Sequence, residues 1–197
     1  MTFEMMESRN AGVKIKVIGV GGAGGNAVNH MISKNLKGVE FLCANTDAQA
    51  LTNTPAEKKL QLGESGLGAG ARPEVGKQAA EDELEKIKEA LSGSHMVFIT
   101  AGMGGGTGTG AAPIVAQAAK EIGALTVGVV TKPFSFEGPR KFRVAEEGLN
   151  CLEEQVDSLI VILNQKLEQV LGDDITQLDA FAKADDVLYN AVAGIAE

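Results

Sequence analysis

Six short apolar runs alternate with segments of helical period along this chain, and this alternation restricts the fold more than any other feature. The runs are rich in Val, Ile, Leu and Phe, as buried strands are, and they occupy residues 14–20, 39–45, 59–62, 96–101, 125–131 and 158–163. Strands and helices in alternation predict parallel strands joined by right-handed crossovers. The expected fold class is therefore α/β, a doubly wound, mainly parallel six-stranded sheet with helices on both faces. Ligands of such sheets bind beyond the carboxyl ends of the strands.

Charge and hydropathy exclude several classes of partner. The net charge is -8 and no basic stripe interrupts the acidic residues, so nucleic acid is not expected as a partner. No apolar run reaches the roughly eighteen residues of a membrane span, and residues 1–10 lack the order of a signal peptide. We therefore expect no direct membrane insertion and a cytoplasmic location.

A first group of glycines follows the first predicted strand. Gly19, Gly21 and Gly24 satisfy the spacing G-x-G-x-x-G, and a helical segment comes directly after them. Glycine permits a tight turn, and the helix amino terminus beyond it presents free N–H groups to an anion such as phosphate. This pattern also fits an oxidoreductase that uses NAD or FAD, with Asp47 close to the position expected for its ribose-binding acid.

A second group of glycines is denser and follows the fourth predicted strand. Six of the nine residues in the segment 102–110 are glycine. Each ordered glycine costs about 0.5 to 1 kcal/mol relative to alanine, so a simple connection would not retain so many. Convergence of backbone N–H groups on phosphate oxygens explains the segment, with Thr107 and Thr109 as additional hydroxyl donors. A dinucleotide fold has no need of it, and no G-x-x-x-x-G-K-[ST] motif is present.

Residues 104–110 resemble the signature of the tubulin/FtsZ superfamily of GTPases. Further segments resemble the FtsZ family of bacterial division proteins, and they are residues 16–22, 45–50, 66–70, 73–76, 96–99, 131–134 and 136–138. The resemblance extends over nearly the whole chain. It implies GTP or GDP with Mg²⁺ as cofactors, the metal being held through the nucleotide, so no protein metal ligand is predicted.

The same resemblance implies a nucleotide-binding site assembled from the whole chain. Its predicted members are Gly21, Gly22, Ala23, Gly24, Gly25, Asn26, Asn45, Asp47, Ala48, Gly68, Ala69, Gly70, Ala71, Gly105, Gly106, Thr107, Gly108, Thr109, Gly110, Glu137, Lys141, Asn164, Phe181 and Asp186. Segments 22–26 and 105–110 would hold the α and β phosphates, and Ala48 with segment 68–71 would approach the γ phosphate and its magnesium. Glu137 would hold the ribose, and Phe181 would stack on the base. Asn164 and Asp186 would read the guanine edge, because a carboxylate accepts from N1–H and the 2-amino group together.

By the same resemblance, the chain is the GTP-binding half of a filament-forming cell-division GTPase of the Z-ring. It would associate head to tail with full-length subunits of that family and contact other division proteins. No catalytic residue is predicted in this chain, because hydrolysis in the family depends on an acidic loop from a neighbouring subunit. We expect a flexible segment at 1–12, a GTP-binding domain at 13–178 and the truncated start of the central helix at 179–197. The chain alone should bind GTP or GDP without hydrolysing GTP efficiently.

Three positions depart from the family pattern. Lys141 stands where an arginine is usual, and lysine lacks the planar fork of donors, so Arg140 or Arg143 would have to substitute for that contact. The stretch between Leu62 and Gly66 is about three residues shorter than usual, which should alter the loop that faces the γ phosphate. Leu163 replaces a proline before Asn164. Besides the oxidoreductase, a nucleotide-gated assembly module without catalysis remains an alternative.

Overall fold

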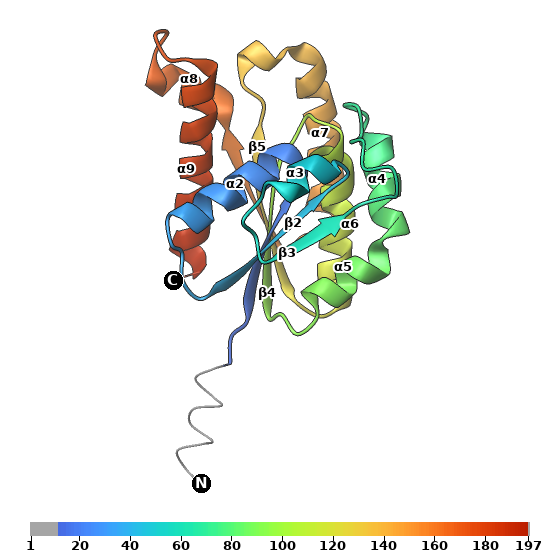
Figure 1. The fold of residues 1–197 in the computed structure, drawn as a ribbon. Helices are drawn as coiled ribbons and strands as arrows, with labels where there is room; N and C mark the ends of the chain where they lie inside the picture. The colour runs from blue at the N-terminus through green and yellow to red at the C-terminus, as the bar shows by residue number, and fades with distance from the viewer. Residues whose placement is uncertain (1–11, 197) are drawn as a thin grey trace, which may run out of the picture.

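The computed structural model describes residues 12–196 and confirms the predicted fold class. Six parallel strands form one sheet in the order β3-β2-β1-β4-β5-β6 (Figure 1). Every strand lies within one residue of its predicted bounds, and the strands are β1 (Ile15–Val20), β2 (Val39–Asn45), β3 (Lys58–Gln61), β4 (Met96–Gly102), β5 (Leu125–Lys132) and β6 (Ser158–Leu163). The segment predicted to be flexible, 1–12, lies outside the described residues except for Gly12.

Helices connect the strands and continue beyond the last one. They are α2 (Gly21–Ser33), α3 (Ala48–Thr52), α4 (Pro73–Asp82), α5 (Leu84–Leu91), α6 (Thr107–Glu121), a 3-10 turn η1 (Ser135–Glu137), α7 (Pro139–Glu153), α8 (Asn164–Leu171) and α9 (Gln177–Ala196). The final helix thus begins two residues before the predicted start of the central helix. Among residues 12–196, none of the helices is both long enough and apolar enough to cross a membrane.

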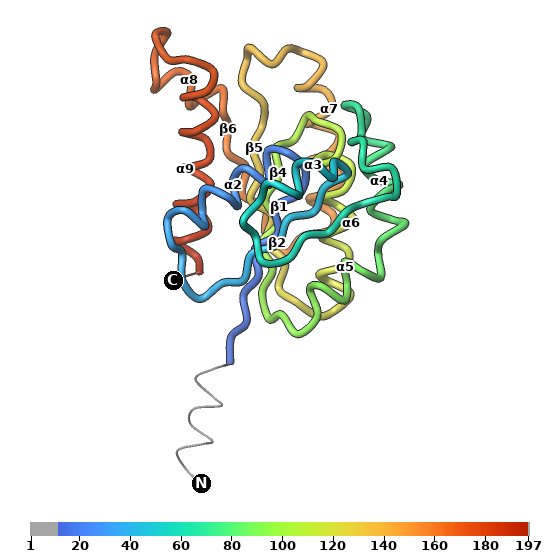
Figure 2. Tube along the Cα trace, viewed as in Figure 1, coloured from blue at the N-terminus to red at the C-terminus, as the bar shows by residue number. Residues whose placement is uncertain are grey.

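The sheet is covered on both faces, as its almost wholly apolar strands require. Figure 1 shows α2 and α9 on one side of the sheet and α4, α5, α6 and α7 on the other. Successive side chains of a strand point to opposite faces, so Val17 of β1 packs with the α2 and α9 core, whereas Ile18 packs with the α5 and α6 core. In Figure 2 the segments that follow β5 and β6 leave the sheet at the end opposite to the one where the chain enters β1.

The two glycine turns of the sequence meet where β1 and β4 end side by side. These strands are paired in the centre of the sheet, with Val20 opposite Ala101. Gly21 has φ +78, and a Cβ atom on it would lie 2.8 Å from the backbone nitrogen of Gly108. The first turn of α2 and the first turn of α6 therefore touch through backbone atoms, and only glycine permits this approach.

We predict that Gly21→Ala lowers the free energy of unfolding by about 3 kcal/mol or more. The left-handed backbone alone costs an alanine about 1 to 2 kcal/mol, and the contact with Gly108 adds to that cost. Gly38→Ala is the matched control, because Gly38 has φ +81 and no atom within 4 Å of its Cβ position. Urea unfolding of both variants measures the difference. If both variants lose the same free energy of unfolding, the close contact between Gly21 and Gly108 does not exist in the protein.

Candidate nucleotide-binding site

A cavity of about 370 Å³ lies at the carboxyl edge of the sheet, at the ends of β1, β2, β4 and β5. Its size is that of a small-molecule site. The predicted residues that line it are Gly22, Ala23, Asn45, Asp47, Gly68, Ala69, Ala71, Gly105, Gly106, Thr107, Gly108, Glu137, Lys141, Asn164 and Phe181. The predicted residues that do not line it are Gly21, Gly24, Gly25, Asn26, Ala48, Gly70, Thr109, Gly110 and Asp186.

One wall of the cavity consists of two helix amino termini. Gly22 and Ala23 belong to the first turn of α2, and Gly105 and Gly106 directly precede α6. Neither Gly22 nor Gly105 has an atom within 4 Å of its Cβ position, so both present open backbone to the cavity. Unpaired N–H groups and the helix dipoles give this wall a positive potential without any charged side chain. The wall is suited to an anion such as phosphate.

Several glycines that the sequence assigned to a ligand instead serve packing. The Cβ position of Gly24 is blocked by the carbonyl of Thr100, and that of Gly110 is blocked by the carbonyl of Pro73. These glycines allow α2 to lie on β4 and α6 to lie against α4. The glycine pattern alone could not separate the two roles, because close approach to protein backbone and close approach to a ligand both exclude a side chain.

The two threonine hydroxyls of the glycine segment bond within the protein. Thr107 Oγ1 lies 2.6 Å from Thr46 Oγ1, and Thr109 Oγ1 accepts a 2.8 Å hydrogen bond from the backbone nitrogen of Gly104. Thr107 still lines the cavity, whereas Thr109 does not. The hydroxyls thus shape the turn, and the backbone N–H groups remain the principal donors toward a ligand.

The loop between β3 and α4 closes the cavity from the side of β2. Ala48 N donates to the carbonyl of Gly66, and Gly68 N donates to the carbonyl of Thr46. Ala71 lines the cavity with φ +59, a left-handed conformation that is unfavourable for alanine. Such backbone strain is typical of ligand-binding loops. The short stretch before Gly66 is therefore sufficient to hold this loop against β2.

Glu137 and Lys141 lie together at the rim, on η1 and the first turn of α7. Glu137 accepts a 2.7 Å hydrogen bond from Phe134 N, and its other oxygen lies 3.4 Å from Lys141 Nζ. Lys141 therefore keeps a place at the cavity although it lacks the fork of an arginine. The alternatives Arg140 and Arg143 are exposed and do not line the cavity.

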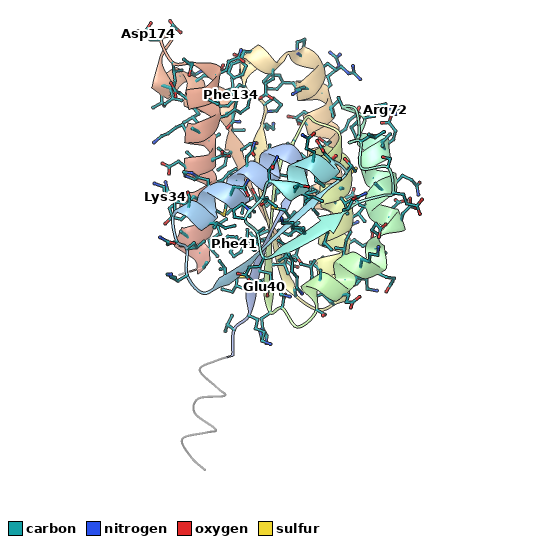
Figure 3. The ribbon with its side chains drawn as sticks, viewed as in Figure 1. Lys34, Glu40, Phe41, Arg72, Phe134 and Asp174 are labelled. Atoms are coloured by element: carbon teal, nitrogen blue, oxygen red, sulfur yellow. The ribbon has the colours of Figure 1, made fainter. Side chains whose placement is uncertain are left out.

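Aromatic rings support the opposite end of the cavity. Phe134, labelled in Figure 3, is fully buried, and its ring meets that of Phe181 edge to face at 5.4 Å. Phe136 stacks on Phe134 at 5.0 Å and also meets Phe181 edge to face. These contacts fix the first turns of α9 to the segment that carries Glu137. Phe181 remains 41% exposed and lines the cavity, so a planar ligand can reach it.

Asn164 provides the clearest sign of a missing hydrogen-bond partner. Its side chain is 3% exposed and lines the cavity, and within the described residues its Oδ1 atom has no hydrogen bond. A buried polar atom without a partner costs about 1 to 3 kcal/mol. A ligand with a suitably placed donor would remove that cost. The Leu163 that replaces proline does not displace Asn164, which still begins α8 directly after β6.

The structure corrects the assignment of the carboxylate on α9. Asp186 points away from the cavity and its Oδ1 lies 3.2 Å from Nε2 of His30, whereas its neighbour Asp185 lines the cavity. The side chains of consecutive helical residues point in directions about 100° apart, so only one of the two neighbours can face the ligand. Helical spacing from Phe181 to Ala184, Asp185 and Leu188 would have identified Asp185, and all four line the cavity.

The two neighbouring carboxyls have opposite pKa shifts. Burial raises the pKa of Asp185 from its ordinary value of 3.8 to about 6, although the imidazole of His30 lowers it in part. The hydrogen bond from His30 lowers the pKa of Asp186. Asp185 makes no hydrogen bond or ion pair with the part of the chain that the structure describes. Its buried carboxylate is therefore the second polar group at this end of the cavity that needs a partner.

Comparison with known proteins identifies the same arrangement elsewhere. The family model described as Tubulin/FtsZ family, GTPase domain, matches residues 14–172. The cell division protein FtsZ of Pseudomonas aeruginosa is 61% identical over 99% of this chain and 50% of its own length. This chain therefore spans about half the length of the curated relatives that it matches.

Solved structures agree with the sequence matches. An empty FtsZ dimer of M. jannaschii superposes with a TM-score of 0.92 and 46% identity, over 100% of this chain and 58% of that chain. CetZ1 of Haloferax volcanii, a GDP-bound monomer, superposes with a TM-score of 0.80 and 25% identity, over 90% of this chain and 58% of that chain. The similarity covers the whole described fold, including every wall of the cavity.

We predict that the two carboxyls of α9 titrate separately in a carboxyl-carbon NMR titration of the free protein. Asp185 should titrate near pH 6 and Asp186 below the ordinary range, since burial raises one pKa and the His30 bond lowers the other. The folded pKa of Asp185 exceeds its unfolded value, so its ionisation destabilises the fold above pH 6. That destabilisation should disappear as the pH falls from 6 toward 4. A single ordinary pKa for both carboxyls would contradict the structure.

Proposed function

Since this chain belongs to the tubulin/FtsZ family of GTPase domains, we propose that its cavity binds GDP or GTP. One observation carries this proposal: the buried Asn164 Oδ1 and the Asp185 carboxylate line the same cavity, and neither has a hydrogen-bond partner among residues 12–196. Both groups are hydrogen-bond acceptors, and Asn164 follows β6, two strands away from β4, whereas α2 and α6 begin after β1 and β4. The ligand therefore needs donors at one end and negative charge at the other.

Guanine supplies the donors that this end requires. Its N1–H and 2-amino group present adjacent donors, whereas adenine offers no such pair on its Watson–Crick edge. The Asp185 carboxylate can accept from both, and Asn164 can accept a further hydrogen or contact the base through its amide. Phe181 offers a ring face for stacking, and we assign the ribose to Glu137, which also lines the cavity. We assign base recognition to Asp185 in place of Asp186.

The phosphates would be held by backbone groups. Among the described residues, the ionisable side chains that line the cavity are Asp47, Glu137, Lys141 and Asp185. Lys141 is paired with Glu137, so the N–H groups at the starts of α2 and α6 are the donors available to phosphate oxygens. Within residues 12–196 no cluster of three His, Cys, Asp or Glu side chains could hold a metal ion. A bound Mg²⁺ would thus take phosphate oxygens and water as ligands.

For the whole protein we propose a filament-forming GTPase of cell division, since the curated relatives are named cell division protein FtsZ. The solved relatives include a dimer. We propose that this chain contributes the nucleotide-binding face of a head-to-tail contact between subunits. Other division proteins would be further partners, and the location would be cytoplasmic. The family match gives no support to the oxidoreductase alternative.

Hydrolysis would need a group from outside the described residues. Asp47 is a cavity-lining carboxylate that pairs with the loop 66–71 through a bridge to Leu67, but its Oδ1 already caps α3 by accepting from Gln49 N and Ala50 N. A capped carboxylate is a weak candidate for activating water. We therefore propose that this chain binds nucleotide and that a neighbouring subunit completes the catalytic site.

We predict that Gly105→Ala abolishes tight GDP binding without loss of stability. A methyl group at Gly105 meets no protein atom within 4 Å and would occupy the space of the phosphates. Calorimetric titration should show a dissociation constant raised at least tenfold. The control is Gly25→Ala, which also has no atom within 4 Å but does not line the cavity, and it should bind GDP like the parent chain. Unchanged binding by Gly105→Ala would place the phosphates elsewhere.

The decisive test of the proposal is a substitution that should change the preferred base from guanine to xanthine. Xanthine carries a carbonyl where guanine carries the 2-amino group, and an asparagine amide can accept from N1–H while donating to that carbonyl. We predict that Asp185→Asn weakens GDP binding at pH 7.5 by about tenfold or more and strengthens XDP binding. Competition against a fluorescent GDP analogue measures both.

Asp174→Asn is the matched control for this exchange. Asp174 lies at the exposed tip before α9, labelled in Figure 3, and does not line the cavity. It should leave the preference for GDP intact. If Asp185→Asn also leaves that preference intact, Asp185 does not read the base.

A further inference from the structure

The helices that carry the two ends of the candidate site are joined by one side-chain hydrogen bond among the described residues. His30 of α2 and Asp186 of α9 approach within 3.2 Å, Nε2 to Oδ1. The His30 side chain is 26% exposed and that of Asp186 is 33% exposed, so the contact is largely covered. Tyr189, one turn further along α9, meets the imidazole edge to face at 6.3 Å. The histidine is thus held on two sides by α9.

This bond acts on the rotation of α9 about its own axis, together with the burial of Leu188 and Val192 in the core that α9 shares with α2. Asp185 and Asp186 are neighbours on the helix, so their side chains leave the axis in directions about 100° apart. Drawing Asp186 toward α2 leaves Asp185 directed at the cavity, which it lines. The second oxygen of Asp186 lies 3.7 Å from Lys183 Nζ, a contact within α9 that does not bear on the rotation of the helix.

A contact near Asp185 is needed to hold α9 in the rotation that directs this carboxylate at the cavity. Asp185 is partly buried and has no hydrogen-bond partner in the described part of the chain, and a carboxylate in that state gains hydration by turning toward water. The aromatic cluster at Phe181 and the buried Leu188 anchor α9 about one turn before and one turn after Asp185. The bond to His30 acts at the position directly after Asp185, where it opposes this tendency most directly.

We propose that His30, acting through Asp186, is a positioning residue that aims Asp185 at the base and thereby sets the selectivity for guanine. This inference rests on the proposed function, because it requires Asp185 to contact the base. His30 itself does not line the cavity. The same helix presents Gly22 and Ala23 to the phosphate end, so α2 contributes to both ends of the site, directly at one and through Asp186 at the other.

A role limited to joining two helices would have a different signature. Loss of a purely structural bond would lower the melting temperature and weaken GDP and IDP binding by the same factor. Loss of a positioning bond would act on the contact that distinguishes the two ligands, namely the 2-amino group that hypoxanthine lacks. The ratio of the dissociation constants of IDP and GDP therefore separates the two roles.

The experiment measures that ratio at pH 7.5 on the full chain, by competition against a fluorescent GDP analogue. We expect a ratio of about ten for the parent chain, since one hydrogen bond to a carboxylate is worth about tenfold. His30→Ala should bring the ratio within about twofold of one. His30→Gln should restore most of it, because its amide can donate to Asp186 over a similar reach.

His95→Ala is the matched control, since His95 is the other histidine of the chain and its Nδ1 accepts from Lys14 N at the opposite end of the sheet. It should leave the ratio unchanged. Should His30→Ala fail to fold, Asp186→Ala breaks the same bond from its more exposed partner, and the same ratio decides. A full ratio in either variant overturns the inference.

Asp185→Ala separates the failure of this inference from the failure of the proposed function. If Asp185→Ala abolishes the discrimination while His30→Ala and Asp186→Ala preserve it, the proposed function stands and the positioning role of His30 is wrong. If the parent chain binds no guanine nucleotide, the proposed function and this inference fail together. If it discriminates equally well without Asp185, nucleotide binding stands, but the assignment of base recognition to Asp185 and this inference both fail.

Discussion

The contact between two glycine turns, at the ends of β1 and β4, is the constraint on which the rest of the structure depends. Gly21 and Gly108 bring the first turns of α2 and α6 into backbone contact. Because both helices begin at this point, their unpaired N–H groups converge on one space, and the cavity forms around it. Bulkier residues would separate the helices, and neither the sheet nor the other walls could compensate for that separation.

The sequence predicted the sheet almost completely, because every strand except the edge strand β3 is a short, mostly apolar run. The strand bounds were correct to within one residue, and the family prediction is confirmed by the family model. Parallel strands buried on both faces leave a strong signal of this kind. The general place of the site followed from the same signal, since the glycine turns come directly after β1 and β4.

The individual roles of residues were harder to predict than the place of the site. Gly24 and Gly110 fit a phosphate-binding pattern, yet their space is taken by the protein's own carbonyl groups. A sequence cannot show which atom approaches a glycine. The confusion of Asp186 with Asp185 has a different cause, since a helix turns by about 100° per residue and a carboxylate one position away serves another partner. Here the partner is His30, far away in the sequence, and only the folded chain reveals it.

The strand order also determines how a bound ligand acts on folding. Ile15 of β1 pairs with Met96 of β4, and the cavity draws further residues from β2, β5 and the distant helix α9. No single stretch of the chain contains more than a few of the cavity-lining residues. A partly folded chain therefore does not form the cavity. A ligand that binds only the complete arrangement stabilises the entire fold by mass action rather than one region of it. Occupancy of the cavity would therefore report directly on the fraction of molecules that are fully folded.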